Sequence, residues 1–220
     1  MSTSRILLSP PEQPEPHGTR IPYAHAARWR SPLETDNQEI MVSVFMSPRA
    51  YVRVCAHAGS DLDNEVGGWL VGKWRVDKRT GQEFTVVEAI LPADHIHHGG
   101  AFLTFTQDSQ VALYDELTER FPEKELVGWY HTHPRMGIFL SDYDLWLHSN
   151  FFPDPHQVAL VIEPHSTTGG FFIRQKDGLL DPQRYFGFYE LTNNRNRSVV
   201  HWRNMLPDAE HIIYQGGLKL

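Results

Sequence analysis

Cysteine is nearly absent from this chain, which has only Cys55 among its 220 residues. A single cysteine excludes an internal disulfide framework, so the fold must rest on packing, and this usage suits a reducing cytoplasm. Cys55 falls in a segment with helical periodicity. We interpret it as a buried structural thiol in preference to a nucleophile.

The sequence also lacks a long apolar run and an excess of positive charge. No stretch is long enough to span a membrane, and the apolar patch at residues 6–8 is too short for a secretory signal. The net charge is −7 and the pI is about 6.0, which argues against a general nucleic-acid binder because such proteins carry a basic face. With 40% hydrophobic and 21% charged residues, the composition predicts a soluble globular protein.

Proline is concentrated at one end of the chain. Residues 1–38 contain six prolines among many polar residues, which predicts a flexible N-terminal arm and not a domain. We expect one domain over residues 39–191 and a C-terminal extension over residues 192–220. We find no internal repeat.

Strand and helix patterns alternate within the expected domain, and this order predicts an α/β fold with a mixed sheet and helices packed on it. The apolar run at 157–163 predicts a central strand buried on both faces. Gly67, Gly68 and Gly72 predict a bulge or a close backbone approach within one strand. The expected strands are 40–46, 65–76, 84–91, 102–106, 127–133, 157–163, 171–175 and 185–191, with a short further strand at 199–205; the expected helices are 48–58, 108–121 and 141–150.

The sequence H-T-H-P-x6-S-x-x-D carries three side chains that bind metals in other proteins. His131 and His133 are two positions apart in a predicted strand, so both point to one face. Pro134 cannot donate to a sheet and should end the strand, and Ser141 can then begin a helix with Asp144 in its first turn. Two imidazoles and one carboxylate leave the fourth position of a tetrahedral zinc to water, as in catalytic zinc sites.

Each part of this motif also has a structural interpretation. Ser141 and Asp144 form a capping box, which is compatible with metal binding because both need the same helix start. His-x-His alone is a weak signal in a chain with 13 histidines. A hydrolytic site further needs a base that is not a ligand. Glu65, at the start of the glycine-rich strand, is our candidate, and Glu88 and Glu163 are competitors.

Together, Glu65, residues 131–134, Ser141 and Asp144 resemble the JAMM (MPN+) motif of zinc-dependent deubiquitinases and their prokaryotic relatives. The spacing matches, and no motif position is substituted. The resemblance implies that His131, His133 and Asp144 bind Zn²⁺. It also implies that Glu65 moves a proton from the attacking water to the leaving amine, and that Ser141 helps to hold the oxyanion.

The same resemblance implies a fold and a substrate class. The family fold is a curved, largely antiparallel mixed sheet flanked by helices, similar to the cytidine deaminase core. Family members cut the bond after the Gly-Gly tail of ubiquitin or a ubiquitin-like protein, so that tail and its conjugates are the expected partners. The chain is most similar to stand-alone JAMM peptidases of bacterial operons, which adds E1-like and E2-like proteins to the expected partners.

Other interpretations stay open at this point. A JAMM hydrolase could release an amino acid or a sulfur carrier from a carrier protein, and a non-catalytic MPN scaffold would bind partners without chemistry. A RadC-like group shares the H-x-H-P…S-x-x-D pattern and is linked to DNA, but the acidic net charge argues against it. The run that contains Asp94, His95, His97 and His98 favours a polar loop over a second metal site.

Overall fold

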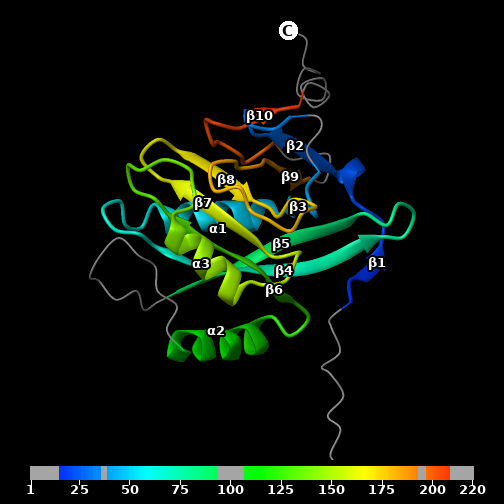
Figure 1. The fold of residues 1–220 in the computed structure, drawn as a ribbon, viewed down its shortest axis with the longest axis horizontal. Coiled ribbons are helices and arrows are strands. Elements are labelled where there is room, and N and C mark those ends of the chain that lie inside the picture. The colour runs from blue at the N-terminus through cyan, green and yellow to red at the C-terminus, as the bar shows by residue number, and fades with distance from the viewer. Residues whose placement is uncertain (1–14, 36–38, 94–106, 193–196, 209–220) are drawn as a thin grey trace, which may run out of the picture.

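A mixed sheet of ten strands forms the centre of this computed structural model, which describes residues 15–35, 39–93, 107–192 and 197–208 (Figure 1). The strand order is β10-β2-β9-β3-β5-β4-β6-β7-β8, and β1 pairs with the far end of β4. The strands are β1 (His17–Thr19), β2 (Ala26–Arg30), β3 (Ser43–Met46), β4 (Gly67–Asp77), β5 (Glu83–Pro92), β6 (Glu125–Thr132), β7 (Val158–Glu163), β8 (Thr168–Phe172), β9 (Phe188–Leu191) and β10 (Leu206–Pro207).

Helices cover both faces of this sheet. Helix α1 (Pro48–Ala58) packs with Tyr130 and Leu160 on one face, whereas α2 (Gln107–Arg120) and α3 (Asp142–Phe151) pack with Trp129 and Val161 on the other. Neighbouring residues of β6 and β7 therefore point to opposite cores, as the two-residue period of a strand requires. A 3-10 turn, η1, spans Tyr23–His25. None of the helices in the described ranges is long and apolar enough to cross a membrane.

The parallel pair β6 and β7 lies inside the sheet, and only β8 lies beyond β7. All six residues of β7 are buried, which confirms the prediction of a strand covered on both faces, but the strand is next to the edge of the sheet and not at its centre. On β6, Trp129 and the two residues that follow it are fully buried. The face that carries Trp129 is the one that α3 covers, so every second residue of β6 is directed at this helix. This geometry decides which side chains can form a site between the two elements.

The N-terminal arm was expected to lie outside the domain, but residues 26–30 form β2, which pairs with β9 in the main sheet. The boundary at residue 39 therefore does not separate the described part of the arm from the sheet.

The expected strand at 199–205 is wrong. The structure has β10 at Leu206–Pro207, and Trp202 and Met205 instead bury their side chains in the α1 core. The expected strand at 102–106 and the histidine-rich run at 94–98 lie outside the described residues.

The prediction of close backbone approach in the glycine-rich strand is confirmed at two positions of β4. A Cβ on Gly72 would lie 1.7 Å from the Val86 carbonyl oxygen, and one on Gly68 would lie 2.2 Å from that of Leu91. The β4–β5 register shifts between Val71 and Gly72, which marks a bulge. Since the obstructing atoms belong to the backbone of β5, no side-chain rotation can make room.

We predict that Gly72→Ala lowers the free energy of unfolding by about 3 kcal/mol, because the added methyl must push two paired strands apart. Gly59→Ala is the matched control. Its nearest neighbour would be the Cys55 carbonyl oxygen at 3.5 Å, and its φ of −86° suits alanine. We expect this control to change stability by less than about 0.5 kcal/mol. Urea denaturation of both variants checks the prediction, and equal midpoints would contradict it.

Candidate metal centre

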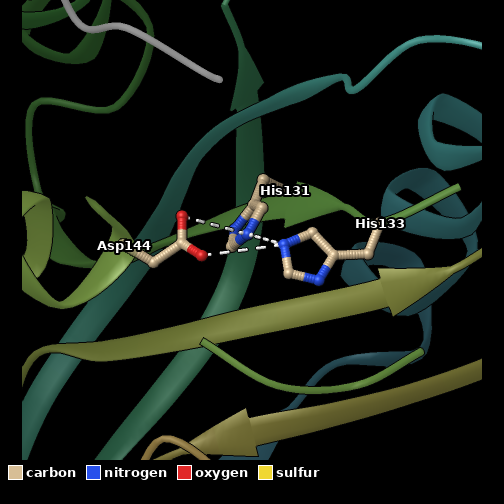
Figure 2. Close-up of side chains that lie close together, drawn as sticks. All are labelled: His131, His133 and Asp144. Carbon is tan, nitrogen blue, oxygen red and sulfur yellow. Dashed lines mark hydrogen bonds and ion pairs between the residues drawn. The ribbon is translucent and has the colours of Figure 1, made fainter. Parts of the chain in front are cut away.

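Three buried side chains converge from two elements of the fold. His131 is the second-last residue of β6, His133 follows directly after the strand, and Asp144 lies in the first turn of α3. Figure 2 shows both imidazoles and the carboxylate directed at one point. The two Nε2 atoms are 2.8 Å apart, His131 Nε2 is 3.4 Å from Asp144 Oδ1, and His133 Nε2 is 3.6 Å from Asp144 Oδ2. The strand-face prediction for the histidines and the helix-start prediction for Asp144 therefore bring the same three residues together.

The backbone after β6 determines the position of His133 and the point at which α3 begins. The His133 N–H donates to the Ile162 carbonyl oxygen at 2.9 Å, so the pairing with β7 continues one residue beyond the strand. The chain then turns at Arg135, which has a left-handed φ of 62° and whose N–H donates to Glu163. At the end of the loop, the side chain of Leu140 is buried and its N–H donates to the Pro182 carbonyl oxygen. Both ends of the loop are thus fixed, which places the start of α3 beside the histidines.

Ser141 and Asp144 form the predicted capping box. The Ser141 hydroxyl and backbone N–H both donate to Asp144 Oδ2 at 2.7 Å, and the Asp144 N–H donates to Ser141 Oγ at 3.2 Å. The capping contacts orient the carboxylate, whose other oxygen is left facing His131. A helix start and a potential ligand therefore share one carboxylate, so the structural and functional interpretations of S-x-x-D are both satisfied.

The electrostatics of the cluster favour the protonation states that bind metals. Burial lowers the pKa of His131, so its ring is neutral near pH 7. Burial acts to raise the pKa of Asp144, but hydrogen bonds with His131, His133 and Ser141 outweigh it and hold that pKa well below its usual range. Neutral imidazoles and an ionised carboxylate are the forms in which these side chains coordinate metals.

The donor set fits a zinc ion. Ligands at about 2.0–2.2 Å from a tetrahedral zinc lie roughly 3.4 Å from one another. The three separations of 2.8, 3.4 and 3.6 Å span this value, and all three donor atoms lie within 4.8 Å of one another. The Nδ1 atoms of both histidines are buried without a hydrogen-bond partner among the described residues, so only the Nε2 atoms face the cluster.

Glu65 lies next to the cluster along the backbone but is not part of the three-residue donor group. It lies two residues before β4, whose first residue, Gly67, is the register partner of His131. Between them, Val66 N–H donates to Thr132 Oγ1, and Thr132 N–H donates to the Val66 carbonyl oxygen, each at 2.9 Å. Continuing the same antiparallel register by two residues places half-buried Glu65 opposite His133. Strand pairing therefore brings the expected base to the end of β6.

The two competing carboxylates are held by other contacts. Glu88 pairs with Lys124 Nζ at 2.6 Å. Glu163 accepts backbone hydrogen bonds from Arg135, His165 and Ser166. Burial acts to raise the pKa of Glu163, but these hydrogen bonds outweigh it and lower that pKa to about 2. Glu163 thus organises the turn after β7 and the loop after β6, and Glu65 is left as the candidate base.

Aromatic rings contact both histidines, a feature that we did not predict from the sequence. The ring of Trp129 stacks on His131 with centroids 4.6 Å apart and planes at 8°, and Phe139 lies 4.7 Å from His133. The stacking on His131 had a sequence signal, since Trp129 and His131 are two positions apart in one strand and share a face.

The family model described as JAB1/Mov34/MPN/PAD-1 ubiquitin protease matches residues 39–152. The COP9 signalosome complex subunit 5 of Candida albicans is 30% identical over 132 residues, which are 56% of this chain and 20% of that protein. The ubiquitin carboxyl-terminal hydrolase RPN11 of Saccharomyces cerevisiae is 25% identical over 150 residues, which are 67% of this chain and 47% of that protein. The NAD(+) hydrolase TcpA of a Theionarchaea archaeon is 33% identical over 69 residues, 31% of this chain and 21% of that protein.

These relatives match this chain over less than half of their own length. The family match covers the three converging candidate ligands, the capping serine and Glu65. The mixed sheet flanked by helices agrees with the fold expected of the family.

We predict that Ser141→Ala lowers the free energy of unfolding of the metal-free protein by about 1–2 kcal/mol, because the variant loses a helix cap and a donor to a buried carboxylate. Ser60→Ala is the matched control, since it removes an exposed hydroxyl that donates to the His57 carbonyl oxygen. We expect a change below about 0.5 kcal/mol for this control. Denaturation in the presence of a chelator measures both, and similar losses in the two variants would contradict the capping role.

Proposed function

The chain belongs to the JAB1/Mov34/MPN/PAD-1 ubiquitin protease family, and from this premise we propose that it is a zinc-dependent isopeptidase or peptidase. In this proposal it hydrolyses the bond after the C-terminal glycine of ubiquitin-like proteins, either to process a precursor or to release a conjugate. The observation that carries the proposal is the convergence of His131, His133 and Asp144 in a buried cluster.

His131, His133 and Asp144 would hold the ion, through two imidazole nitrogens and one carboxylate. A Zn²⁺ bound there supplies Lewis acidity, which brings the pKa of a coordinated water down towards 7. Three protein ligands leave one coordination position for water or substrate, which is the arrangement of catalytic zinc sites. The protein's own contribution begins with orienting the ligands, and the capping contacts of Ser141 do this for the carboxylate.

Glu65 would act as the general base. It takes a proton from the attacking water and delivers it to the amine of the leaving lysine or peptide, since an amine leaves readily only after protonation. Two features support this assignment: Glu65 lies two residues before Gly67, the register partner of His131, and the competing carboxylates of Glu88 and Glu163 have other partners in the fold. A positioned general base typically contributes about 10²–10⁴ in rate.

Ser141 would help to stabilise the oxyanion that forms on the scissile carbonyl. Its hydroxyl proton is directed at Asp144 Oδ2 in this structure. A hydroxyl rotates about its C–O bond, so the same proton can turn to a substrate oxygen while the backbone N–H of Ser141 continues to hold Asp144. Loss of one such donor typically costs about 10²–10³ in rate.

The substrate class is suggested by the relatives. RPN11 of Saccharomyces cerevisiae is named a ubiquitin carboxyl-terminal hydrolase. The two glycines at the end of such a tail carry no side chains, so this part of the chain can approach a buried metal centre closely. We infer that this chain acts on the tail of a ubiquitin-like protein, with E1-like and E2-like proteins as operon partners, and that it works in the cytoplasm.

We predict that Glu65→Gln lowers kcat/KM on a ubiquitin-like fusion ending in Gly-Gly by at least about 10²-fold and leaves about one equivalent of zinc bound, because Glu65 is not a ligand. Asp144→Asn should lose both zinc and activity, because its carboxylate is a ligand. Glu88→Gln is the matched control and should keep both, since its carboxylate pairs with Lys124. Cleavage is followed by gel, and zinc content by elemental analysis.

Three results would overturn the proposal. If the purified protein holds no zinc and cuts no fusion, the chain is a non-catalytic scaffold with an unused ligand set. If Glu65→Gln and Asp144→Asn lose zinc equally, Glu65 is a ligand and another group is the base. A chelator that leaves the cleavage rate unchanged would exclude metal-dependent hydrolysis.

A further inference from the structure

A second buried contact joins helix α3 to strand β6, one turn along the helix from Asp144. His148 is fully buried, and its Nδ1 accepts a hydrogen bond from Trp129 Nε1 at 3.1 Å. His148 follows Asp144 by four residues, so both side chains lie on one face of α3. Trp129 precedes His131 by two residues on one face of β6. The helix therefore docks on the strand through two side-by-side contacts, Asp144 with His131 and His148 with Trp129.

The contact between His148 and Trp129 is connected to the metal centre through ring stacking. Trp129 lies flat against His131, with centroids 4.6 Å apart and planes at 8°. Metal-binding histidines usually donate their second ring N–H to a carboxylate, a carbonyl or water, which fixes the ring. His131 has no such partner at Nδ1 among the described residues. Besides the contacts of its Nε2 with His133 and Asp144, the flat face of Trp129 is what limits the rotation of this imidazole.

The protonation state of His148 follows from this geometry. An indole N–H only donates, so His148 Nδ1 must carry no proton and the ring must be neutral. Burial, followed by the nearby positive charge of Arg174, lowers the pKa of His148 to about 3, which agrees with a neutral ring. His148 Nε2 is buried without a hydrogen-bond partner among the described residues. A buried imidazole with one unpaired nitrogen lowers stability relative to a leucine at the same position. We therefore look for a role of His148 in the hydrogen bond that its Nδ1 accepts from Trp129.

We propose that His148 is a positioning residue for the metal centre, acting through Trp129 on the ligand His131. This inference rests on the proposed function only in taking the cluster to be a metal site. The hydrogen bond fixes the indole plane, the indole plane fixes the imidazole of His131, and the same contact fixes how α3 lies on β6 and thus where Asp144 sits. The machinery of the site then extends beyond the H-x-H…S-x-x-D residues to a pair that touches neither metal nor substrate.

The test compares zinc affinity in variants that remove or keep an acceptor for the Trp129 N–H at position 148. The affinity is measured by competition with a chromophoric chelator. His148→Leu fills a similar volume without an acceptor and should weaken zinc binding by about 10–100-fold. In His148→Gln, the glutamine side chain can still accept a hydrogen bond from Trp129. Its zinc affinity should stay within about 3-fold of that of the wild type, because the weakening in His148→Leu comes mostly from the loss of this hydrogen bond. Trp129→Phe keeps a flat ring but loses the donor, so it should weaken binding in the same direction as His148→Leu.

Two further measurements separate positioning from general stability. The double variant Trp129→Phe/His148→Leu should bind zinc no more weakly than the weaker single variant, since both remove one interaction. The visible absorption spectrum of the Co²⁺-substituted protein should change in His148→Leu and be restored in His148→Gln, because it reports ligand geometry directly. A contact that only stabilises the fold would lower the unfolding temperature and leave this spectrum unchanged.

His156→Leu is the matched control. His156 is also a buried histidine stacked on a tryptophan, Trp74, with centroids 4.1 Å apart. Trp74 lies seven residues along β4 from Gly67, the register partner of His131, which is about 20 Å at the usual rise of a strand. We expect this variant to change stability and to leave zinc affinity and the Co²⁺ spectrum unchanged.

The inference is wrong if His148→Leu, folded and measured below its unfolding temperature, binds zinc as the wild type does. It is also wrong if His156→Leu weakens zinc binding equally, or if His148→Gln fails to restore it. Isopeptidase activity is a separate readout. If the variants change zinc affinity as expected but the wild type cuts no Gly-Gly fusion, the proposed function fails and the positioning role stands.

Discussion

The site depends on how one helix start is held against one strand end. Asp144 can face His131 and His133 only because α3 begins where the loop from β6 is fixed at both ends, by Glu163 at Arg135 and by Pro182 at Leu140. The carboxylate is buried, so its charge must be satisfied locally. The capping box supplies two donors from Ser141 to Oδ2, which also faces His133, and Oδ1 faces His131.

The sheet supports this arrangement through β4, β6 and β7, which are neighbours in the strand order. The parallel pairing of β6 with β7 continues past the end of β6, which holds His133 in extended backbone beside His131. On the opposite side, the antiparallel β4 brings Glu65 to the same end of β6, and its close glycine contacts with β5 fix the position of that strand. The candidate base and the candidate ligands thus come from neighbouring parts of the fold: the residue segment before β4, the end of β6 and the start of α3.

Sequence periodicity anticipated most of this arrangement because the features involved are local. Residues two apart in a strand share a face, proline ends a strand, and S-x-x-D begins a helix, so the three candidate ligands could be chosen before any fold was known. The same reasoning failed at residues 26–30 and 199–205. In those segments the pairing with β9 and the burial of Trp202 in the α1 core come from distant parts of the chain, which local patterns do not encode.

The sequence by itself determined which side chains could bind a metal and that they would lie on one strand face and at one helix start. Only the tertiary structure decided that these two places meet, that the residues after Glu65 pair with the end of β6, and that Glu88 and Glu163 contact other residues. It also showed that the imidazole of His131 rests on Trp129, which His148 holds from α3. The physical reason is that spacing along the chain fixes direction within an element, whereas the docking of elements depends on burial and strand register between residues far apart in sequence.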